Sequence, residues 1–351
     1  MNDTIAIKKP FDAHVHFRQG AMLRAVVPFT ASNWSRAIVM PNTVPPIETA
    51  ELAATYKKEI LGAVPRGTAF EPLMTFYLTK KLTPGDIEAG TEGSTCKIFA
   101  VKSYPFGATT NSQWGFASVL EAKEVLKKME EFGMPLLLHG EVHVDESGNE
   151  IDPHGSERLF IEDVLPRLLD AYPNLKVSLE HLSTKIGAEF IEKNGKEGRL
   201  VATVTPHHLL YSRDDAEKNV LLRCKPAIKG AADREAVRAL VAKGLPFVFA
   251  GTDSAPHPES KKLSANPAFG VFSASVALEL YTQVFEGLGA LDKLENFLSI
   301  YGPRFYDLPT SAETITLEKK EWQLAEVVIT ESGEKIVPMA GTATIRWHVA
   351  R

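Results

Sequence analysis

The sequence of 351 residues has few cysteines, no long apolar run and no excess of basic residues. Its two cysteines, Cys96 and Cys224, lie far apart in the chain, which argues against a disulfide scaffold or a cysteine-based zinc site and favours a reducing compartment. No segment approaches the ~20 apolar residues that span a membrane, and the N-terminus does not resemble a secretion signal. The net charge of -5 predicts no nucleic-acid partner. We expect a cytoplasmic protein without a membrane partner.

Hydrophobic residues make up 44% of the chain and charged residues 24%, as in ordinary globular proteins. Short β-rich apolar runs alternate with longer amphipathic segments, which is typical of parallel βαβ units, and eight such units close into a barrel. We therefore predict an α/β fold, a (β/α)8 TIM-like barrel, as a single domain over residues 1–351. The predicted strands are 10–17, 36–41, 70–78, 96–102, 134–139, 176–181, 200–205 and 246–252. The clearest predicted helices are 112–132, 156–171, 185–193 and 232–243.

The pattern changes after Pro309. Residues 314–317 and 344–347 alternate apolar and polar side chains, as strands of a small sheet do. We predict that residues 310–351 are a C-terminal β extension packed on the barrel, and that the first residues of the chain join it.

Two histidines stand close together near the start of the sequence, His14 and His16, in an apolar segment expected to be a strand. Side chains two residues apart on a strand point to the same face. Two adjacent imidazoles suit a metal ion, which takes a lone pair from each ring. The pair alone is equally compatible with two structural histidines.

Polar residues also stand where other predicted strands end. Active sites of such barrels lie at the C-terminal ends of the strands, so we expect these side chains to meet at one mouth. They are Arg18, Asn42, Lys102, His139, His181 and Asp253, in addition to the histidine pair. Four histidines, an aspartate and a lysine at strand ends favour a metal site over a chance arrangement.

These residues and their neighbours resemble the amidohydrolase superfamily in its binuclear subtype and, within it, the dihydroorotase family of the homodimeric bacterial type. The likeness covers nearly the whole chain. Residues 301–306 resemble a family motif that more often begins with asparagine. The other matching phrases are HVHFR at 14–18, MPNT at 40–43, KSYP at 102–105, ATTNS at 108–112, HGE at 139–141, EH at 180–181, TPHHL at 205–209 and GTDSAPH at 251–257.

The resemblance implies two Zn²⁺ ions per subunit, bridged by a hydroxide and by Lys102 in its N6-carboxylated form. His14, His16 and Asp253 would hold one zinc, and His139 and His181 the other. The two cations would lower the pKa of the bound water and polarise the carbonyl under attack. Asp253 would be the catalytic acid–base residue that carries a proton to the leaving amide nitrogen.

The resemblance further implies a small-molecule substrate, with reversible conversion of N-carbamoyl-L-aspartate to dihydroorotate in pyrimidine biosynthesis, and a homodimer. The substrate carboxylate would be bound by Arg18, in bidentate fashion, with Asn42 and His257 beside it. The remaining substrate contacts implied by the resemblance are His139, the loop residues Thr109 and Thr110, and backbone groups near Lys225 and near Phe269 and Gly270. Residues 266–270 depart from the small Cys/Gly/Ala-rich stretch usual in the family, which leaves the position of that last contact open.

Two alternatives stay open. A related amidohydrolase acting on hydantoin, dihydropyrimidine or allantoin would share the metal site, although Arg18, Asn42 and His257 favour a ring with a carboxylate. A catalytically inactive barrel would be expected to lack ligands that this chain keeps, and Lys102 disfavours a mononuclear deaminase. We interpret His143, His154 and His348 as surface or structural residues, and we assign no role to 145–155. His207 and His208 follow the predicted strand 200–205; one of them could face the barrel mouth, but neither is needed to complete the site.

Overall fold

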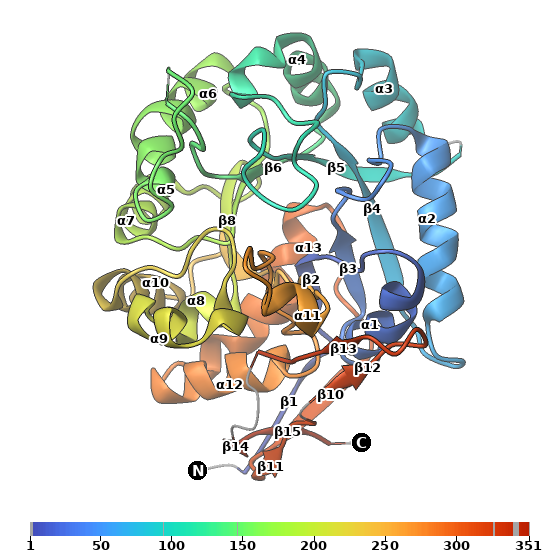
Figure 1. Cartoon of the computed structure of the whole chain (residues 1–351), viewed down its shortest axis with the longest axis vertical. Helices are drawn as coiled ribbons and strands as arrows, with labels where there is room; N and C mark the ends of the chain where they lie inside the picture. Colours follow the sequence, from blue (N-terminus) through green and yellow to red (C-terminus); the bar gives the residue numbers. More distant parts are fainter. Residues whose placement is uncertain (1–2, 94, 146, 326, 340–343, 351) are drawn as a thin grey trace.

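Eight parallel strands form one sheet in which each strand pairs with the next along the chain. The computed structural model describes residues 3–93, 95–145, 147–325, 327–339 and 344–350. Helices surround the strands on the outside (Figure 1). The strands are β2 (Phe11–Val15), β3 (Arg36–Val39), β4 (Glu71–Tyr77), β5 (Ile98–Ser103), β6 (Leu136–His139), β7 (Val177–Glu180), β8 (Leu200–Val204) and β9 (Val248–Ala250). All eight predicted strands are confirmed.

The residues that follow β9 close the ring. The backbone N–H of Asp253 donates to the carbonyl of His14 over 2.9 Å, and the N–H of His16 donates to the carbonyl of Ser254 over 3.0 Å. Ser254 forms a parallel bridge with Val15. The predicted (β/α)8 TIM-like barrel is therefore confirmed, with the first and last strands joined beside the histidine pair.

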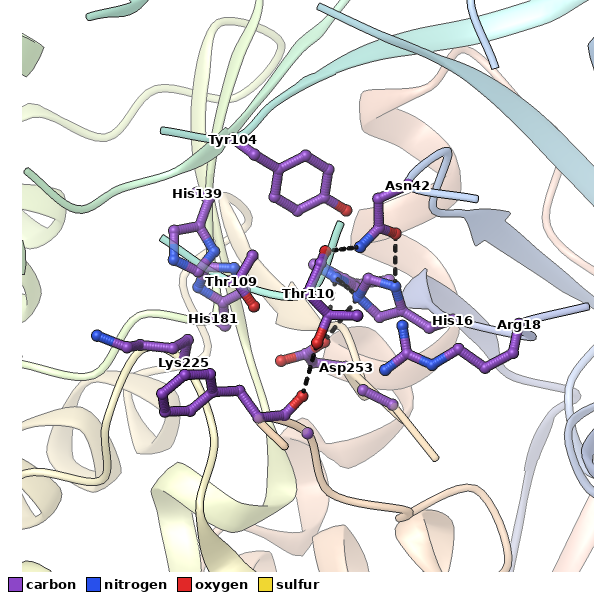
Figure 2. Close-up of a pocket in the computed structure, with 14 residues that line it drawn as sticks. His16, Arg18, Asn42, Tyr104, Thr109, Thr110, His139, His181, Lys225 and Asp253 are labelled. Carbon is purple, nitrogen blue, oxygen red and sulfur yellow. Dashed lines mark hydrogen bonds and ion pairs between the residues drawn. The ribbon is translucent and has the colours of Figure 1, made fainter. Parts of the chain in front are cut away.

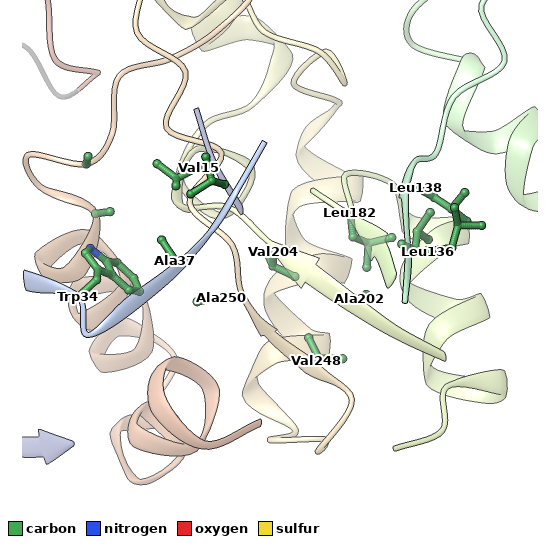
Figure 3. Close-up of a cluster of buried hydrophobic side chains, with 14 of the residues drawn as sticks. Val15, Trp34, Ala37, Leu136, Leu138, Leu182, Ala202, Val204, Val248 and Ala250 are labelled. Carbon is green, nitrogen blue, oxygen red and sulfur yellow. The ribbon is translucent and has the colours of Figure 1, made fainter. Parts of the chain in front are cut away.

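Alternation along the strands separates two apolar layers. Leu136 and Leu138 of β6 belong to the large cluster between the strands and the helices, part of which Figure 3 shows. Leu137 belongs to a second cluster that fills the barrel interior together with Ala100 of β5. Residues two positions further along the same strands face the same way, so polar side chains at the strand ends lie directly above this apolar plug.

The larger outer helices follow the strands in the order expected for βα units. They are α1 (Gly20–Asn33), α2 (Ala50–Ala63), α3 (Pro84–Glu92), α4 (Lys123–Phe132), α7 (Lys185–Asn194), α10 (Ala231–Ala242) and α12 (Ala277–Gly287). Residues 156–171 form α5 (Ser156–Leu159), the π-helical turn η2 (Phe160–Val164) and α6 (Leu165–Ala171). The shorter helices are α8 (Pro206–Leu210), α9 (Arg213–Lys218), α11 (Glu259–Lys262) and α13 (Tyr301–Phe305). None of the described helices is long and apolar enough to cross a membrane.

One predicted helix is too long. The prediction placed a helix over 112–132, but α4 begins at Lys123, after a short 3₁₀ turn at Val119–Glu121. Ser118 and Glu121 form a capping box that starts this turn. Gly115 packs so closely on the carbonyl of Tyr104 that a Cβ there would lie 2.1 Å from its oxygen. The segment before Ser118 is therefore an irregular loop that packs against the end of β5.

The extension after the barrel consists of short antiparallel pairs. β10 (Thr314–Glu318) lies between β1 (Thr4–Lys8) and β15 (His348–Val349). β11 (Trp322–Gln323) pairs with β14 (Thr344–Ile345), and β12 (Val328–Ile329) pairs with β13 (Lys335–Ile336). The predicted strand at 314–317 and the participation of the first residues are confirmed, whereas the predicted strand at 344–347 ends at Ile345.

Candidate active site

The C-terminal ends of the strands meet at a small cavity (Figure 2). Lys102 and His257 do not line it, but each lies beside a residue that does: Lys102 Nζ is 5.1 Å from the ring centroid of Tyr104, and His257 Nε2 is 3.0 Å from Arg18 Nη2. All predicted site residues thus come together in space. The lining residues are His14, His16, Arg18, Asn42, Tyr104, Thr109, Thr110, His139, His181, Lys225, Asp253, Ala255, Phe269 and Gly270.

Strand geometry explains how these side chains reach the mouth. Lys102 and His139 lie two residues beyond the interior-facing Ala100 and Leu137, so they point into the barrel above the plug. His181 and Asp253 lie just past β7 and β9 and adopt φ values of 44° and 43°. Such left-handed backbone is uncommon for residues with a side chain and is found at functional sites.

Two overlapping groups of nitrogen and oxygen atoms occupy the centre. His14 Nε2 and His16 Nε2 each lie 3.2 Å from Asp253 Oδ1. His14 Nδ1 lies 3.0 Å from Glu180 Oε2, and His181 stands beside this pair. Within the part of the chain that the structure describes, neither ring nitrogen of the buried His181 has a hydrogen-bond partner. A buried imidazole normally has one, so this ring is poised to bind a group outside the protein.

Charged groups are concentrated at the centre. The buried carboxylates of Glu180 and Asp253 lie beside His14, and Glu180 also forms an ion pair with Lys102. Burial lowers the pKa of His14, but the charges of Glu180 and Asp253 outweigh it and raise the pKa to about 9. Burial would raise the pKa of Asp253, but the charge of His14 holds it well below its usual value. This carboxylate therefore stays ionised.

The donor set suits a divalent metal: His14, His16 and Asp253 come together as predicted, whereas His181 is grouped with His14 and Glu180 and not with His139. Imidazole and carboxylate groups are zinc ligands, and metal binding would displace the second proton of His14. His181 supplies ring nitrogens without a protein partner, as noted above. Burial, as the largest cause, lowers the pKa of Lys102, which favours the neutral amine that reacts with CO2. His139 is held differently, because its Nε2 lies 2.7 Å from Glu141 Oε2 and only its Nδ1 is left for another ligand.

Asn42 connects the central histidines to the loop that contains Thr109 and Thr110. His16 Nδ1 donates to Asn42 Oδ1 over 2.9 Å, which leaves the lone pair of His16 on Nε2, facing Asp253. Asn42 Nδ2 donates to the carbonyl of Thr110 over 2.9 Å. In this structure the amide of Asn42 therefore orients a histidine and holds the loop, in addition to its predicted place near the substrate.

Arg18 is a cation without an acidic partner among the described residues. Its Nε donates to the carbonyl of Pro256 over 3.0 Å, and its Nη2 lies 3.0 Å from His257 Nε2. Burial, and then the charge of Arg18, lowers the pKa of His257 to about 2, so this ring is neutral. A partly buried guanidinium beside a neutral imidazole is a receptor for a carboxylate.

The loop with Thr109 and Thr110 covers the mouth. Thr110 Oγ1 donates to the carbonyl of Phe269 over 3.3 Å, which links the loop to the opposite wall. The enclosed cavity measures about 20 Å³, far below the ~300–1,000 Å³ of typical small-molecule sites. A cavity of this size is too small for a ring-shaped ligand, so part of its lining would have to rearrange on binding.

Sequence reasoning gave no role to three residues of this site. Tyr104 lines the cavity with its ring 5.1 Å from Lys102 Nζ, and Glu141 and Glu180 contact His139 and Lys102. Their positions in the sequence pointed to the site, since each follows or precedes a predicted ligand by one or two residues. The sequence did not show which side chain each of them contacts.

His207 and His208 are both buried, and within the described residues neither ring nitrogen of His207 has a hydrogen-bond partner. His208 is satisfied by Thr205 Oγ1 at 2.8 Å and by the carbonyl of Pro226 at 3.2 Å. His143 and His154 line a separate cavity of about 660 Å³ beside Lys225 and Phe269. Neither pair belongs to the central cluster, and the interpretation of His143 and His154 as structural or surface residues stays a prediction.

The chain was compared with known protein families. Residues 10–324 match the Amidohydrolase family, and the chain belongs to that family. It is therefore a hydrolase, as predicted.

The particular relatives are dihydroorotases. The dihydroorotase of Halorhodospira halophila is 45% identical over 353 residues, covering 99% of each chain. The mitochondrial dihydroorotase of Arabidopsis thaliana is 45% identical over 98% of this chain and 90% of its own length. The crystal structure of dihydroorotase from Saccharomyces cerevisiae in complex with 5-fluoroorotic acid has a TM-score of 0.92 at 35% identity, over 99% of this chain and 98% of that one. These similarities confirm the predicted type of enzyme, a cyclic amidohydrolase of the dihydroorotase kind.

Proposed function

We propose that this enzyme interconverts N-carbamoyl-L-aspartate and (S)-dihydroorotate in de novo pyrimidine biosynthesis, with zinc as its metal. The observation that carries the substrate is the guanidinium of Arg18, which has no acidic partner among the described side chains and lies beside His257 at the edge of the histidine cluster. A ring that carries a carboxylate supplies the missing anion, and the yeast relative is known in complex with 5-fluoroorotic acid, a ring of this kind.

The proposed zinc ligands are the residues of the central cluster. His14, His16 and Asp253 would hold one Zn²⁺, His139 and His181 the other, and carboxylated Lys102 would bridge them. When bound, the ions supply Lewis-acid polarisation of the ring carbonyl and a lowered pKa of bound water. The carbamate of Lys102 would release its ion pair with Glu180, and Glu180 would then keep its contact with His14 Nδ1, which orients that ring through its outer nitrogen.

Asp253 is the proposed proton carrier. Its carboxylate is buried and ionised, so it has a free oxygen lone pair that would take the proton of the attacking water. In ring opening, a C–O bond forms at the carbonyl carbon and the ring C–N bond breaks. The proton on Asp253 then goes to the leaving amide nitrogen, and in ring closure the same steps run in reverse.

The other residues bind and orient the substrate. Arg18 donates to its carboxylate, with His257 and Asn42 beside it, and the loop of Thr109 and Thr110 closes over the ring and excludes water. Backbone groups at Lys225 and Phe269, which also line the cavity, would hold the ring edge.

The decisive experiment compares three rings with the purified protein, namely dihydroorotate, dihydrouracil and hydantoin. We expect kcat/KM for dihydroorotate to exceed the other two by a factor of at least ~10², because only this ring offers a carboxylate to Arg18. Equal use of dihydrouracil would replace the proposal by a hydantoinase-type function. The homodimer, the cytoplasmic location and the description of 1–351 as one domain stay predictions.

A further inference from the structure

Lys262 is a buried lysine whose ammonium is bound by backbone carbonyls. It is the last residue of the short helix α11, only 5% exposed. Its Nζ donates to the carbonyls of Arg223 at 2.7 Å, Ala268 at 3.1 Å and Gly270 at 2.7 Å. Three donors meet three acceptors, so the ammonium is saturated, and no carboxylate of the described chain pairs with it.

These carbonyls belong to two segments far apart in the sequence. Arg223 lies two residues before Lys225, while Ala268 and Gly270 flank Phe269. Lys225, Phe269 and Gly270 all line the active-site cavity. The N–H of Gly270 also donates to the carbonyl of Arg223 over 3.0 Å, so the ammonium and one backbone bond fasten the same two segments together.

The fastening also fixes which way the backbone faces. The carbonyls of residues 268 and 270 point to Lys262, whereas that of Phe269 lies 2.8 Å from His257 Nε2 and 3.3 Å from Thr110 Oγ1. Gly270 has φ +145°, and a Cβ there would meet the carbonyl oxygen of Ala255 at 2.4 Å. The backbone of 268–270 is thus confined between Lys262 on one side and the carboxylate pocket on the other.

The ring of Phe269 adds a second tie between the segments. The guanidinium carbon of Arg223 lies 4.6 Å from its centroid and the Lys225 ammonium 5.3 Å from it. Such cation–π contacts are modest when exposed, and Arg223 is exposed here. The buried ammonium of Lys262 makes three hydrogen bonds to the two walls, beside the single backbone bond between Gly270 and Arg223.

We infer that Lys262 is a positioning residue for substrate binding: it clamps segments 223–225 and 268–270 at the spacing that fits the substrate ring. This inference rests on the proposed function, because it assigns the clamped backbone to the ring of dihydroorotate. Burial, as the largest cause, lowers the pKa of Lys262 to about 8, so the ammonium keeps its charge at neutral pH without an acidic partner.

The test compares Lys262→Met, which keeps length and removes all donors, with Lys262→Gln, which keeps two neutral N–H donors. Lys261→Met is the matched control, because Lys261 is an exposed neighbour on the same helix. We expect Lys262→Met to raise KM for dihydroorotate roughly tenfold with kcat within about threefold. The displaced backbone would lose contacts to the substrate that stabilise the ground state and the transition state alike. Lys262→Gln should lie between wild type and Lys262→Met, and Lys261→Met should match wild type.

Hydrogen exchange gives a readout that does not depend on turnover. In wild type the amide of Gly270 should exchange slowly, and in Lys262→Met the peptides over 220–226 and 266–272 should exchange at least about tenfold faster, with the barrel strands unchanged. Fast exchange of Gly270 in wild type would overturn the clamp even if Lys262→Met did not fold. A kcat loss with unchanged KM, or an equal change in Lys261→Met, would overturn the positioning role. If wild type does not use dihydroorotate, the proposed function fails, while the exchange data still decide whether the clamp exists.

Discussion

Arg18 offers the sharpest test of substrate choice, through Arg18→Met. The guanidinium uses Nε for the carbonyl of Pro256 and Nη2 for His257, which leaves further N–H donors for a carboxylate. Loss of a charge-assisted pair in a desolvated site costs roughly 2–5 kcal/mol. At 1.36 kcal/mol per tenfold change, kcat/KM for dihydroorotate should fall by a factor of roughly 30 to 5,000.

The assay measures kcat/KM for dihydroorotate and for dihydrouracil, together with the zinc content of each preparation. Dihydrouracil has no carboxylate, so its poor turnover should hardly change, and the discrimination between the two rings should shrink by nearly the whole factor. Arg24→Met is the control, since Arg24 is an exposed cation that pairs with Glu331 at 2.8 Å, away from the cavity. An equal fall for both rings would mean that Arg18 supports the fold or the metals and would refute its role in carboxylate binding.

Three further outcomes are expected. Lys102→Ala should lose metal and activity together, and gently handled wild type should carry the extra mass of one CO2 in its intact-mass spectrum; an unmodified lysine in fully active protein would exclude the bridge. Asp253→Asn should reduce activity by roughly 10²–10⁴-fold, with metal content measured alongside; a zinc-loaded variant with near-normal rate would assign the proton to another group. Burial lowers the pKa of His207 to about 4, so the folded state should lose up to about 3 kcal/mol as pH falls from the unfolded value near 6.5 through 4; urea unfolding should show a shallower acid slope for His207→Gln, and an unchanged slope would contradict this.

Much of the fold could be predicted because each strand carries its own local signal. The apolar runs that become β6 and β8 are short and alternate with amphipathic segments. This pattern is sufficient to predict a parallel barrel. The helix predicted from residue 112 failed because Gly115 packs on the carbonyl of Tyr104, a contact between segments that a helical pattern does not reveal.

The candidate site also contains some residues that the sequence could predict and others that it could not. His14, His139 and Asp253 could be found because strand ends carry ligands in such barrels, so position along the chain was enough. Glu180 and Lys262 were not found, since their importance depends on which partner lies opposite, Lys102 in one case and three backbone carbonyls in the other. Pairings of that kind are set by the tertiary fold and leave no periodicity in the sequence.

The closure of the barrel beside the histidine pair has a consequence for biosynthesis. Thr252 Oγ1 contacts the carbonyl of His14 across 238 positions, so the two halves of the proposed metal site leave the ribosome far apart in time. Until β9 docks, the nascent chain presents two imidazoles without their aspartate and can hold a metal only weakly. Tight metal uptake would thus mark the last step of maturation. If the chain were divided between β8 and β9, recovery of bound metal would report that the two fragments had reassembled.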